Sequence, residues 1–238
     1  MKNYLDQIVL TEDGSPSMAW DFDGGRRETM HAKEGAVSET NYIYGEALRI
    51  LQQNNWPPRV LSMGLGLGYN EFLAAAYFID PALTDTRILS FEKDPGLREQ
   101  FAAWVKNEAC DLGSVYEKIL TLTAALTGCT PLELKLTLAR LLAKNQLQLH
   151  GELTLDLKLE SGFSAILYDA FSGYSQPELW QQNHIAEFLK KYAAPNCVFT
   201  TYACTGQLKR ALTAENFKLL PRKGFSFKRE ATLAIRGL

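Results

Sequence analysis

Cysteine and histidine are scarce in this chain, and no long hydrophobic run occurs in it. The four cysteines form no CxxC pair and the three histidines are scattered, so neither a disulfide framework nor a zinc site is indicated. We therefore expect buried, reduced thiols and no metal. The longest apolar run, Phe72 to Ile79, is far too short to cross a bilayer. The start, MKNYLDQIVL, lacks the regions of a signal peptide, and we expect a soluble, cytoplasmic protein.

An excess of positive charge is also missing. Lys and Arg number 25 against 27 Asp and Glu, which gives a formal net charge of -2 at pH 7. This balance argues against binding to nucleic acid or membrane by bulk charge, although a local basic patch stays open. The 238 residues are enough for one full α/β domain with a sizeable core.

Apolar runs alternate with amphipathic segments from residue 59 onward, which predicts alternating strands and helices. Within this region, TPLE at 130–133 is a capping box with proline at the first helical position. We expect strands within residues 59–64, 87–94, 152–159, 164–171 and 197–202. We expect helices within residues 69–79, 95–109, 110–144, 178–192 and 205–216.

The two ends of the chain carry hairpin patterns. Residues 7–22 predict a short hairpin that turns at Asp13–Gly14, and a helix is expected from Ser38 onward. One face of that helix gathers Ile43, Ala47, Ile50 and Leu51. Residues 217–235 contain two strand-like runs joined through a glycine, so the last strand should be antiparallel.

This order of elements predicts the fold class. We expect an α/β, Rossmann-like, doubly wound and mostly parallel sheet with an antiparallel C-terminal hairpin strand. Residues 59–238 would form this domain, and residues 1–58 an N-terminal extension of hairpin and helix packed on it. Ligands of such sheets bind beyond the carboxyl ends of the strands, at the point where the strand order reverses.

A glycine-rich turn, GLGLG, follows the first strand of this domain. Its glycines, Gly64, Gly66 and Gly68, are spaced GxGxG, whereas a dinucleotide fingerprint would place its third glycine at position 69, which is Tyr69. A GxGxG turn also suits S-adenosylmethionine, because the backbone can approach the ligand and the next helix begins there. Glu92 ends the following strand, where an acid can accept hydrogen bonds from both hydroxyls of a ribose. The pattern therefore predicts a nucleoside-containing cofactor and leaves both identities open.

Asp169 ends a later apolar strand, in the stretch LYDAFSGYSQPELW. It falls where the reactive end of such a cofactor should lie. A carboxylate there can orient an amine nucleophile and accept its proton, which is most of what methyl transfer requires of a protein. The alternative is an acid that only caps a helix or braces a loop.

Several stretches together resemble one known family. They are EGAVSETNYIYGEAL, MGLGLGYNEFL, SFEKDP and LYDAFSGYSQPELW, followed by TTYACTGQLKRAL and PRKGFSFKREATLAI. In order and spacing they are similar to the methyltransferase domain of the bacterial tRNA 5-methylaminomethyl-2-thiouridine biosynthesis proteins. The resemblance covers the chain from about Thr11 onward.

The resemblance implies a class I S-adenosylmethionine-dependent methyltransferase that methylates an aminomethyl group on the wobble uridine of certain tRNAs. It implies that Gly64, Gly66, Gly68 and Asn70 line the cofactor and that Glu92 binds its ribose. It further implies that Asp169 faces the methyl donor and the substrate amine. Bifunctional members also carry a flavin oxidoreductase domain, which we do not expect within these 238 residues.

The chain departs from the family between residues 152 and 169. The family has a Gly-Asp pair after the strand that matches residues 152–159, then a helix, and that acid lies near the adenine. Here only residues 160–164 separate this strand from the next, too few to connect adjacent parallel strands. Residues 152–159 should then pair elsewhere, pair antiparallel or lie outside the main sheet, and Glu160 is a poor substitute for the acid.

This departure keeps one alternative open, a non-catalytic binding or interaction protein that retains the fold with a degraded adenine pocket. The glycine turn leaves a second, an NAD-dependent oxidoreductase, which is disfavoured by Tyr69 and by the absence of a recognisable hydride-transfer acid.

Basic residues gather in the C-terminal third, where they could contact the phosphates of tRNA. They are Lys209, Arg210, Arg222, Lys223, Lys228 and Arg229. Phe225 and Phe227 lie between them and could stack on a base. The alternative is a set of solvated charges that flank a hairpin.

Overall fold

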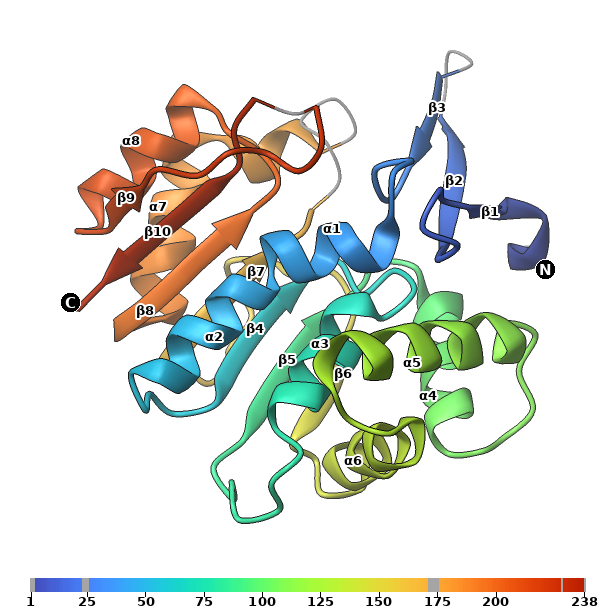
Figure 1. The fold of residues 1–238 in the computed structure, drawn as a ribbon. Helices are drawn as coiled ribbons and strands as arrows, with labels where there is room; N and C mark the ends of the chain where they lie inside the picture. Colours follow the sequence, from blue (N-terminus) through green and yellow to red (C-terminus); the bar gives the residue numbers. More distant parts are fainter. Residues whose placement is uncertain (1–2, 23–25, 171–175, 228, 238) are drawn as a thin grey trace.

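The protein is described by a computed structural model that covers residues 3–22, 26–170, 176–227 and 229–237. Its centre is a seven-stranded sheet with the order β6-β5-β4-β7-β8-β10-β9 (Figure 1). Strands β6, β5, β4, β7 and β8 are parallel, and β10 is antiparallel to both of its neighbours. The strands are β4 (Arg59–Met63), β5 (Arg87–Phe91), β6 (Leu147–His150), β7 (Phe163–Tyr168), β8 (Ala193–Thr201), β9 (Lys218–Leu220) and β10 (Thr232–Arg236).

Helices cover both faces of this sheet (Figure 1). Neighbouring residues of one strand point to opposite faces, so Val60 and Leu61 enter two separate apolar clusters. The cluster of Val60 contains α1 to α6, and the cluster of Leu61 contains α7 and α8. The helices are α1 (Ala36–Ile43), α2 (Gly45–Gln53), α3 (Tyr69–Tyr77), α4 (Pro95–Val105), α5 (Gly113–Thr127), α6 (Pro131–Ala143), α7 (Gln182–Tyr192) and α8 (Gly206–Ala214). The predicted doubly wound α/β fold with an antiparallel C-terminal hairpin strand is confirmed.

A second, three-stranded sheet stands beyond the carboxyl ends of the central strands (Figure 1). It follows a 3-10 turn, η1 (Tyr4–Gln7), and comprises β1 (Ile8–Leu10), β2 (Pro16–Phe22) and β3 (Arg26–Thr29). Leu10 pairs with Pro16, so the predicted turn at Asp13–Gly14 is confirmed. No pattern in the sequence predicts β3, because RRET is charged and lacks an apolar alternation.

Two predicted helices differ from the structure in their extent. The helix expected from Ser38 is two helices, α1 and α2, that meet at Tyr44, although all four predicted apolar residues are buried. The helix expected over 178–192 begins as a 3-10 turn, η2 (Pro177–Trp180), before α7. The capping box at Thr130 and Glu133 is confirmed at the start of α6.

The strand expected at residues 152–159 is wrong. The third parallel strand is β6, just before it, and residues 151–162 carry the chain back from this edge to β7 without a helix. Alternating leucines at 153, 155, 157 and 159 mimic the period of a strand, but they pack against the apolar cluster of Leu61. Lys191 Nζ donates to the carbonyl oxygens of Leu155 and Leu157, which supplies partners that a sheet would otherwise provide. The alternative that this segment lies outside the main sheet is correct.

All four cysteines are free thiols, as predicted, but only one of them is buried. Cys197 is buried, and Cys110, Cys129 and Cys204 are partly exposed. In the described ranges of the chain, no helix combines the length and the apolar character needed to cross a membrane.

Candidate functional site

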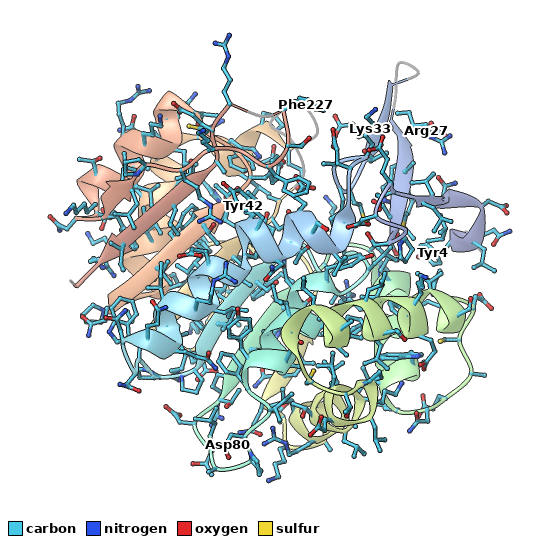
Figure 2. All side chains as sticks on the ribbon, in the orientation of Figure 1. Tyr4, Arg27, Lys33, Tyr42, Asp80 and Phe227 are labelled. Carbon is cyan, nitrogen blue, oxygen red and sulfur yellow. The ribbon has the colours of Figure 1, made fainter. Side chains whose placement is uncertain are left out.

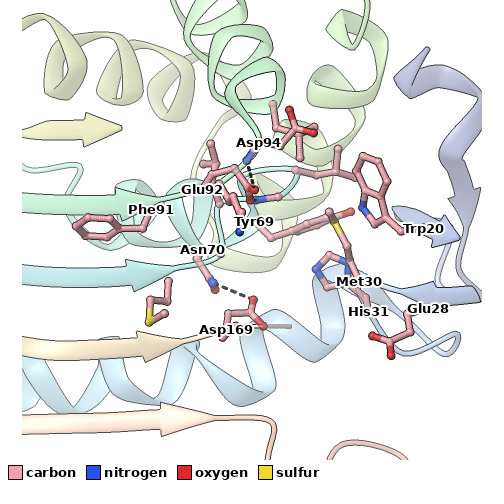
Figure 3. Close-up of a pocket in the computed structure, with 18 of the residues that line it drawn as sticks. Trp20, Glu28, Met30, His31, Tyr69, Asn70, Phe91, Glu92, Asp94 and Asp169 are labelled. Atoms are coloured by element: carbon pink, nitrogen blue, oxygen red, sulfur yellow. Dashed lines mark hydrogen bonds between the residues drawn. The ribbon is translucent and has the colours of Figure 1, made fainter. Parts of the chain in front are cut away.

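A cavity of about 1170 Å³ opens at the carboxyl ends of β4, β5 and β7 (Figure 3). The strand order reverses here, since β5 lies on one side of β4 and β7 on the other. Such a crevice is the usual ligand site of a doubly wound sheet. The central sheet contributes Gly64, Gly66, Glu92 and Asp169 to the lining, and the N-terminal sheet closes the opposite side.

The glycine turn between β4 and α3 requires its glycines for two different reasons. Gly64, Gly66 and Gly68 have φ angles of 84°, 49° and 80°, a left-handed region that favours glycine. A Cβ at Gly64 would lie 2.3 Å from the Asp169 carbonyl oxygen, and one at Gly68 would lie 2.5 Å from the Phe101 ring. Gly68 therefore serves packing and does not line the cavity. The bare face of Gly66 meets only the Met30 side chain, with 3.1 Å from Sδ to an added Cβ.

Glu92 is held directly beside this turn. Its Oε2 accepts a hydrogen bond from the Gly66 amide at 3.0 Å, and its Oε1 accepts one from the Asp94 amide at 2.9 Å. Each carboxylate oxygen can accept two hydrogen bonds, so each retains one lone pair for a ligand. The geometry suits a pair of adjacent hydroxyl groups, such as those of a ribose.

Asp169 lies at the end of β7, across the cavity floor from Glu92 (Figure 3). Its Oδ2 accepts a hydrogen bond of 3.1 Å from Asn70 Nδ2, in the first turn of α3. Burial raises the pKa of Asp169 to about 7, aided by Glu39 and Glu71 and opposed by Tyr44 and Asn70. A carboxyl with this pKa can take up and release a proton near neutral pH.

Tyr69, which replaces the third glycine of a dinucleotide fingerprint, attaches the N-terminal sheet to this site. Its hydroxyl donates to the Pro16 carbonyl at 2.6 Å, and the His31 ring meets its ring edge-on with centroids 4.8 Å apart. Met30 and Trp20 also face the cavity (Figure 3). The sequence contained no motif for these wall residues, because their segment is distant from the glycine turn along the chain. The one feature of the sequence that pointed to this wall is Tyr69, which stands where a dinucleotide fingerprint has its third glycine.

A glycine and an acid do follow the third strand, at Gly151 and Glu152. Both line the cavity, and Glu152 Oε1 pairs with Lys93 Nζ at 3.1 Å. The family's Gly-Asp pair is expected after the third strand, and residues 152–159 are not that strand. Glu160 lies at the other end of the sheet, 2.6 Å from Arg59. An acid is therefore present after the third parallel strand, at Glu152, and not at Glu160.

Among the described basic residues of the C-terminal third, several are paired and do not form one free patch. Lys209 pairs with Glu230 at 2.9 Å, and Arg210 Nε donates to Gln182 Oε1 at 2.8 Å. Arg222 is half-buried, stacks on the Tyr42 ring and donates to the Tyr42 carbonyl.

The remaining basic and aromatic residues lie on the loop between β9 and β10. Lys223 and Arg229 are exposed, and Lys228 lies outside the described residues. Phe225 packs against Tyr42, whereas Phe227 is 90% exposed on this loop (Figure 2). No cluster of three or more His, Cys, Asp or Glu side chains placed to hold a metal ion occurs among the described residues.

Two comparisons at the level of sequence support the resemblance to this family. Residues 129–237 match the model of a family described as S-adenosyl-L-methionine-dependent methyltransferase. The chain is 29% identical to the tRNA 5-methylaminomethyl-2-thiouridine biosynthesis bifunctional protein MnmC of Aromatoleum aromaticum, over 94% of this chain and 34% of that protein. It is 26% identical to the MnmC protein of Aeromonas hydrophila, over 85% of this chain and 32% of that protein.

A solved structure shares the fold. The crystal structure of MNMC2 from Aquifex aeolicus superposes with a TM-score of 0.62 and 20% identity, over 97% of this chain and 69% of that chain. This chain spans about a third of the length of the bifunctional relatives. The resemblance to the methyltransferase domain of the tRNA 5-methylaminomethyl-2-thiouridine biosynthesis proteins, predicted from the sequence motifs, is confirmed.

Proposed function

We propose that this protein is an S-adenosylmethionine-dependent methyltransferase that acts on an aminomethyl group of a modified tRNA wobble uridine. The observation that carries the proposal is the convergence of the glycine turn, Glu92 and Asp169 on one cavity. The description of the matched family supports S-adenosylmethionine as the cofactor, and the names of the bifunctional relatives support a modified tRNA uridine as the substrate. Because this chain spans only part of those relatives, the reaction and the tRNA substrate are proposals for it.

The described residues fit the cofactor. Gly66 offers a bare backbone face to the cavity, Glu92 keeps a free lone pair on each oxygen, and Asn70 Oδ1 is buried without a hydrogen-bond partner. Gly64, Gly66 and Asn70 would line the cofactor, with Gly68 shaping the turn, and Glu92 would hold the ribose. Glu152 lines the cavity just after the third parallel strand and would lie near the adenine, as the family's acid does. Bound S-adenosylmethionine would supply an electrophilic methyl group.

The chain's own part in the reaction centres on Asp169. Asn70 fixes the orientation of its carboxylate, and burial brings its pKa to about 7. In its ionised form it accepts a proton from the protonated acceptor amine, which frees the lone pair on that nitrogen. The N-terminal sheet, through Met30 and Trp20, covers the cavity and limits access of water to the reacting groups.

Contacts with tRNA would come from the C-terminal third. Lys223 and Arg229 are exposed on the loop of Phe227, while Lys209 and Arg210 would exchange their present partners for phosphates. Arg222 would act indirectly by holding Tyr42, and Lys228 belongs to the same proposed set. Action on tRNA also fits the expected cytoplasmic location.

Two measurements test this function. Titration calorimetry with S-adenosylhomocysteine should show binding that weakens about 100-fold in Glu92→Gln, because charged hydrogen bonds to the ribose are lost. Transfer of labelled methyl groups to tRNA with an unmethylated aminomethyluridine should fall by roughly 10²–10⁴ in Asp169→Asn. Glu160→Gln, at the other end of the sheet, is the matched control and should keep both properties.

The outcomes separate the alternatives. Absence of binding at millimolar S-adenosylhomocysteine would refute the methyltransferase, and binding without methyl transfer to tRNA would refute the substrate. The non-catalytic alternative is not favoured, because the acid whose loss motivated it has a counterpart after β6.

A further inference from the structure

The cavity floor contains polar atoms that no described residue satisfies. Thr40 Oγ1, Tyr44 Oη and Asn70 Oδ1 are inaccessible to solvent and have no hydrogen-bond partner in standard geometry. Their side chains are 2%, 3% and 2% exposed, and all three residues line the cavity. Buried polar atoms without partners are uncommon in folded proteins, so this concentration requires an explanation. A ligand that donates hydrogen bonds would provide one.

The backbone fixes Tyr44 beside Asp169. Tyr44 lies at the break between α1 and α2, and the Ile43 carbonyl at this break accepts a 2.8 Å hydrogen bond from Thr200 Oγ1 on β8. Thr200 is fully buried, so the break is anchored to the central sheet. The Tyr44 hydroxyl lowers the pKa of the Asp169 carboxyl, against the effect of burial, although the two groups form no hydrogen bond of standard geometry.

The chemistry of these atoms indicates the ligand group. Asn70 Oδ1 can only accept hydrogen bonds, and the ionised Asp169 carboxylate likewise only accepts. A phenol can both donate and accept a hydrogen bond, and the Tyr44 hydroxyl does neither with a described residue. Glu39, which raises the pKa of Asp169, adds further negative charge to the floor. A protonated amine, with several N–H donors and a positive charge, matches this set.

We propose that Tyr44 is a positioning residue of the acceptor site: its hydroxyl orients the Asp169 carboxylate and, with Asn70 Oδ1, accepts hydrogen bonds from the substrate amine. This inference rests on the proposed methyltransferase function. The proton that leaves the ammonium passes from its nitrogen to Asp169, and the nitrogen retains the electron pair of that N–H bond. Tyr44 therefore affects the reaction through the ionisation and orientation of Asp169.

The groups that face Asp169 come from several elements. Tyr44 and Glu39 belong to the α1–α2 segment, Asn70 and Glu71 to α3, and Tyr202 follows β8. Tyr44 and Asn70 lower the pKa of Asp169, whereas the carboxylates Glu39 and Glu71 raise it. Removal of the Tyr44 hydroxyl should then raise the pKa of Asp169 further.

Tyr44→Phe tests this role because it deletes only the hydroxyl. We expect unchanged affinity for S-adenosylhomocysteine by calorimetry and a loss of about tenfold in kcat/KM for the aminomethyluridine tRNA. The rising limb of the pH profile of kcat/KM should move to higher pH. Independently of activity, ¹³C NMR titration of the Asp169 carboxyl in the free protein should show the same upward shift. Tyr116→Phe removes another buried, unpartnered hydroxyl outside the cavity and is the matched control.

The possible results are distinguishable. A Tyr44→Phe variant with wild-type kinetics and an unchanged Asp169 titration would overturn the inference and leave the methyltransferase function standing. Weakened S-adenosylhomocysteine binding in Tyr44→Phe would also overturn it, because the hydroxyl would then serve the cofactor. An inactive wild type that nonetheless binds S-adenosylhomocysteine would overturn both the inference and the proposed substrate.

Discussion

The two halves of the cavity are built in different ways. On the β4–β5 side, one short turn supplies Gly64 and Gly66, and the next strand supplies Glu92 about a helix later. On the other side, the lining comes from the N-terminal sheet and from Gly151 and Glu152, where the chain leaves the sheet edge. The first half is held by backbone hydrogen bonds to Glu92, and the second by packing and an exposed ion pair.

This difference shows where a substitution should have the greatest effect. In the glycine-turn half, Gly64 has no room for a side chain, because the Asp169 backbone lies against it, and Glu92 is held by two backbone hydrogen bonds. After β6, by contrast, Gly151 meets only the end of the Arg98 side chain, and Glu152 is half-exposed and pairs with Lys93. We therefore expect steep losses in one half and shallow ones in the other, which paired variants can test.

The largest contrast should come from two glycines. Gly64→Ala places a Cβ 2.3 Å from the Asp169 carbonyl oxygen at a φ of 84°, and we expect a loss of about 3 kcal/mol in the free energy of unfolding. Gly151→Ala meets only the Arg98 side chain at 4.0 Å and should change this free energy by less than about 0.5 kcal/mol. Urea denaturation measures both, and equal losses would abolish the proposed distinction.

The second contrast concerns pH and two acids. Burial raises the pKa of Glu71, on α3 beneath the glycine turn, from 4.5 to about 7, whereas Glu152 has a half-exposed side chain. Because the folded-state pKa is the higher one, ionised Glu71 destabilises the fold progressively as the pH rises from 4.5 through 7. Relative to wild type, Glu71→Gln should become more stable between pH 4 and pH 8.5, by up to about 3 kcal/mol.

Thermal unfolding across this pH range measures the effect. Glu152→Gln is the control and should follow the wild-type pH dependence. A Glu71→Gln variant that runs parallel to wild type at every pH would show that Glu71 is not held protonated by burial.

The same division explains what the sequence could predict. Gly64, Gly66 and Glu92 lie in local patterns whose spacing depends on one strand–turn–helix–strand unit, and the structure places them together. The prediction of a strand at residues 152–159 was wrong, because alternating leucines also occur in an irregular segment that packs against one face of a sheet. Tyr44 and Met30 reach the cavity only through tertiary packing between distant segments, which no local period records. Their role in catalysis, like that of Asp169 and Asn70, stays a prediction.

The smallest contrast lies in the crossing segment itself. Lys191 Nζ donates to the carbonyl oxygens of Leu155 and Leu157, while the neighbouring Lys190 is simply exposed. Lys191→Met keeps most of the apolar stem but removes both hydrogen bonds, and we expect a loss of about 1 kcal/mol in the free energy of unfolding. Hydrogen exchange should become faster within residues 153–159, whereas the glycine turn should exchange as before. Lys190→Met is the matched control. If Lys191→Met left exchange unchanged in this segment, the packed leucines alone would hold it, and the β6 side of the cavity would be more rigid than its exposed ion pair suggests.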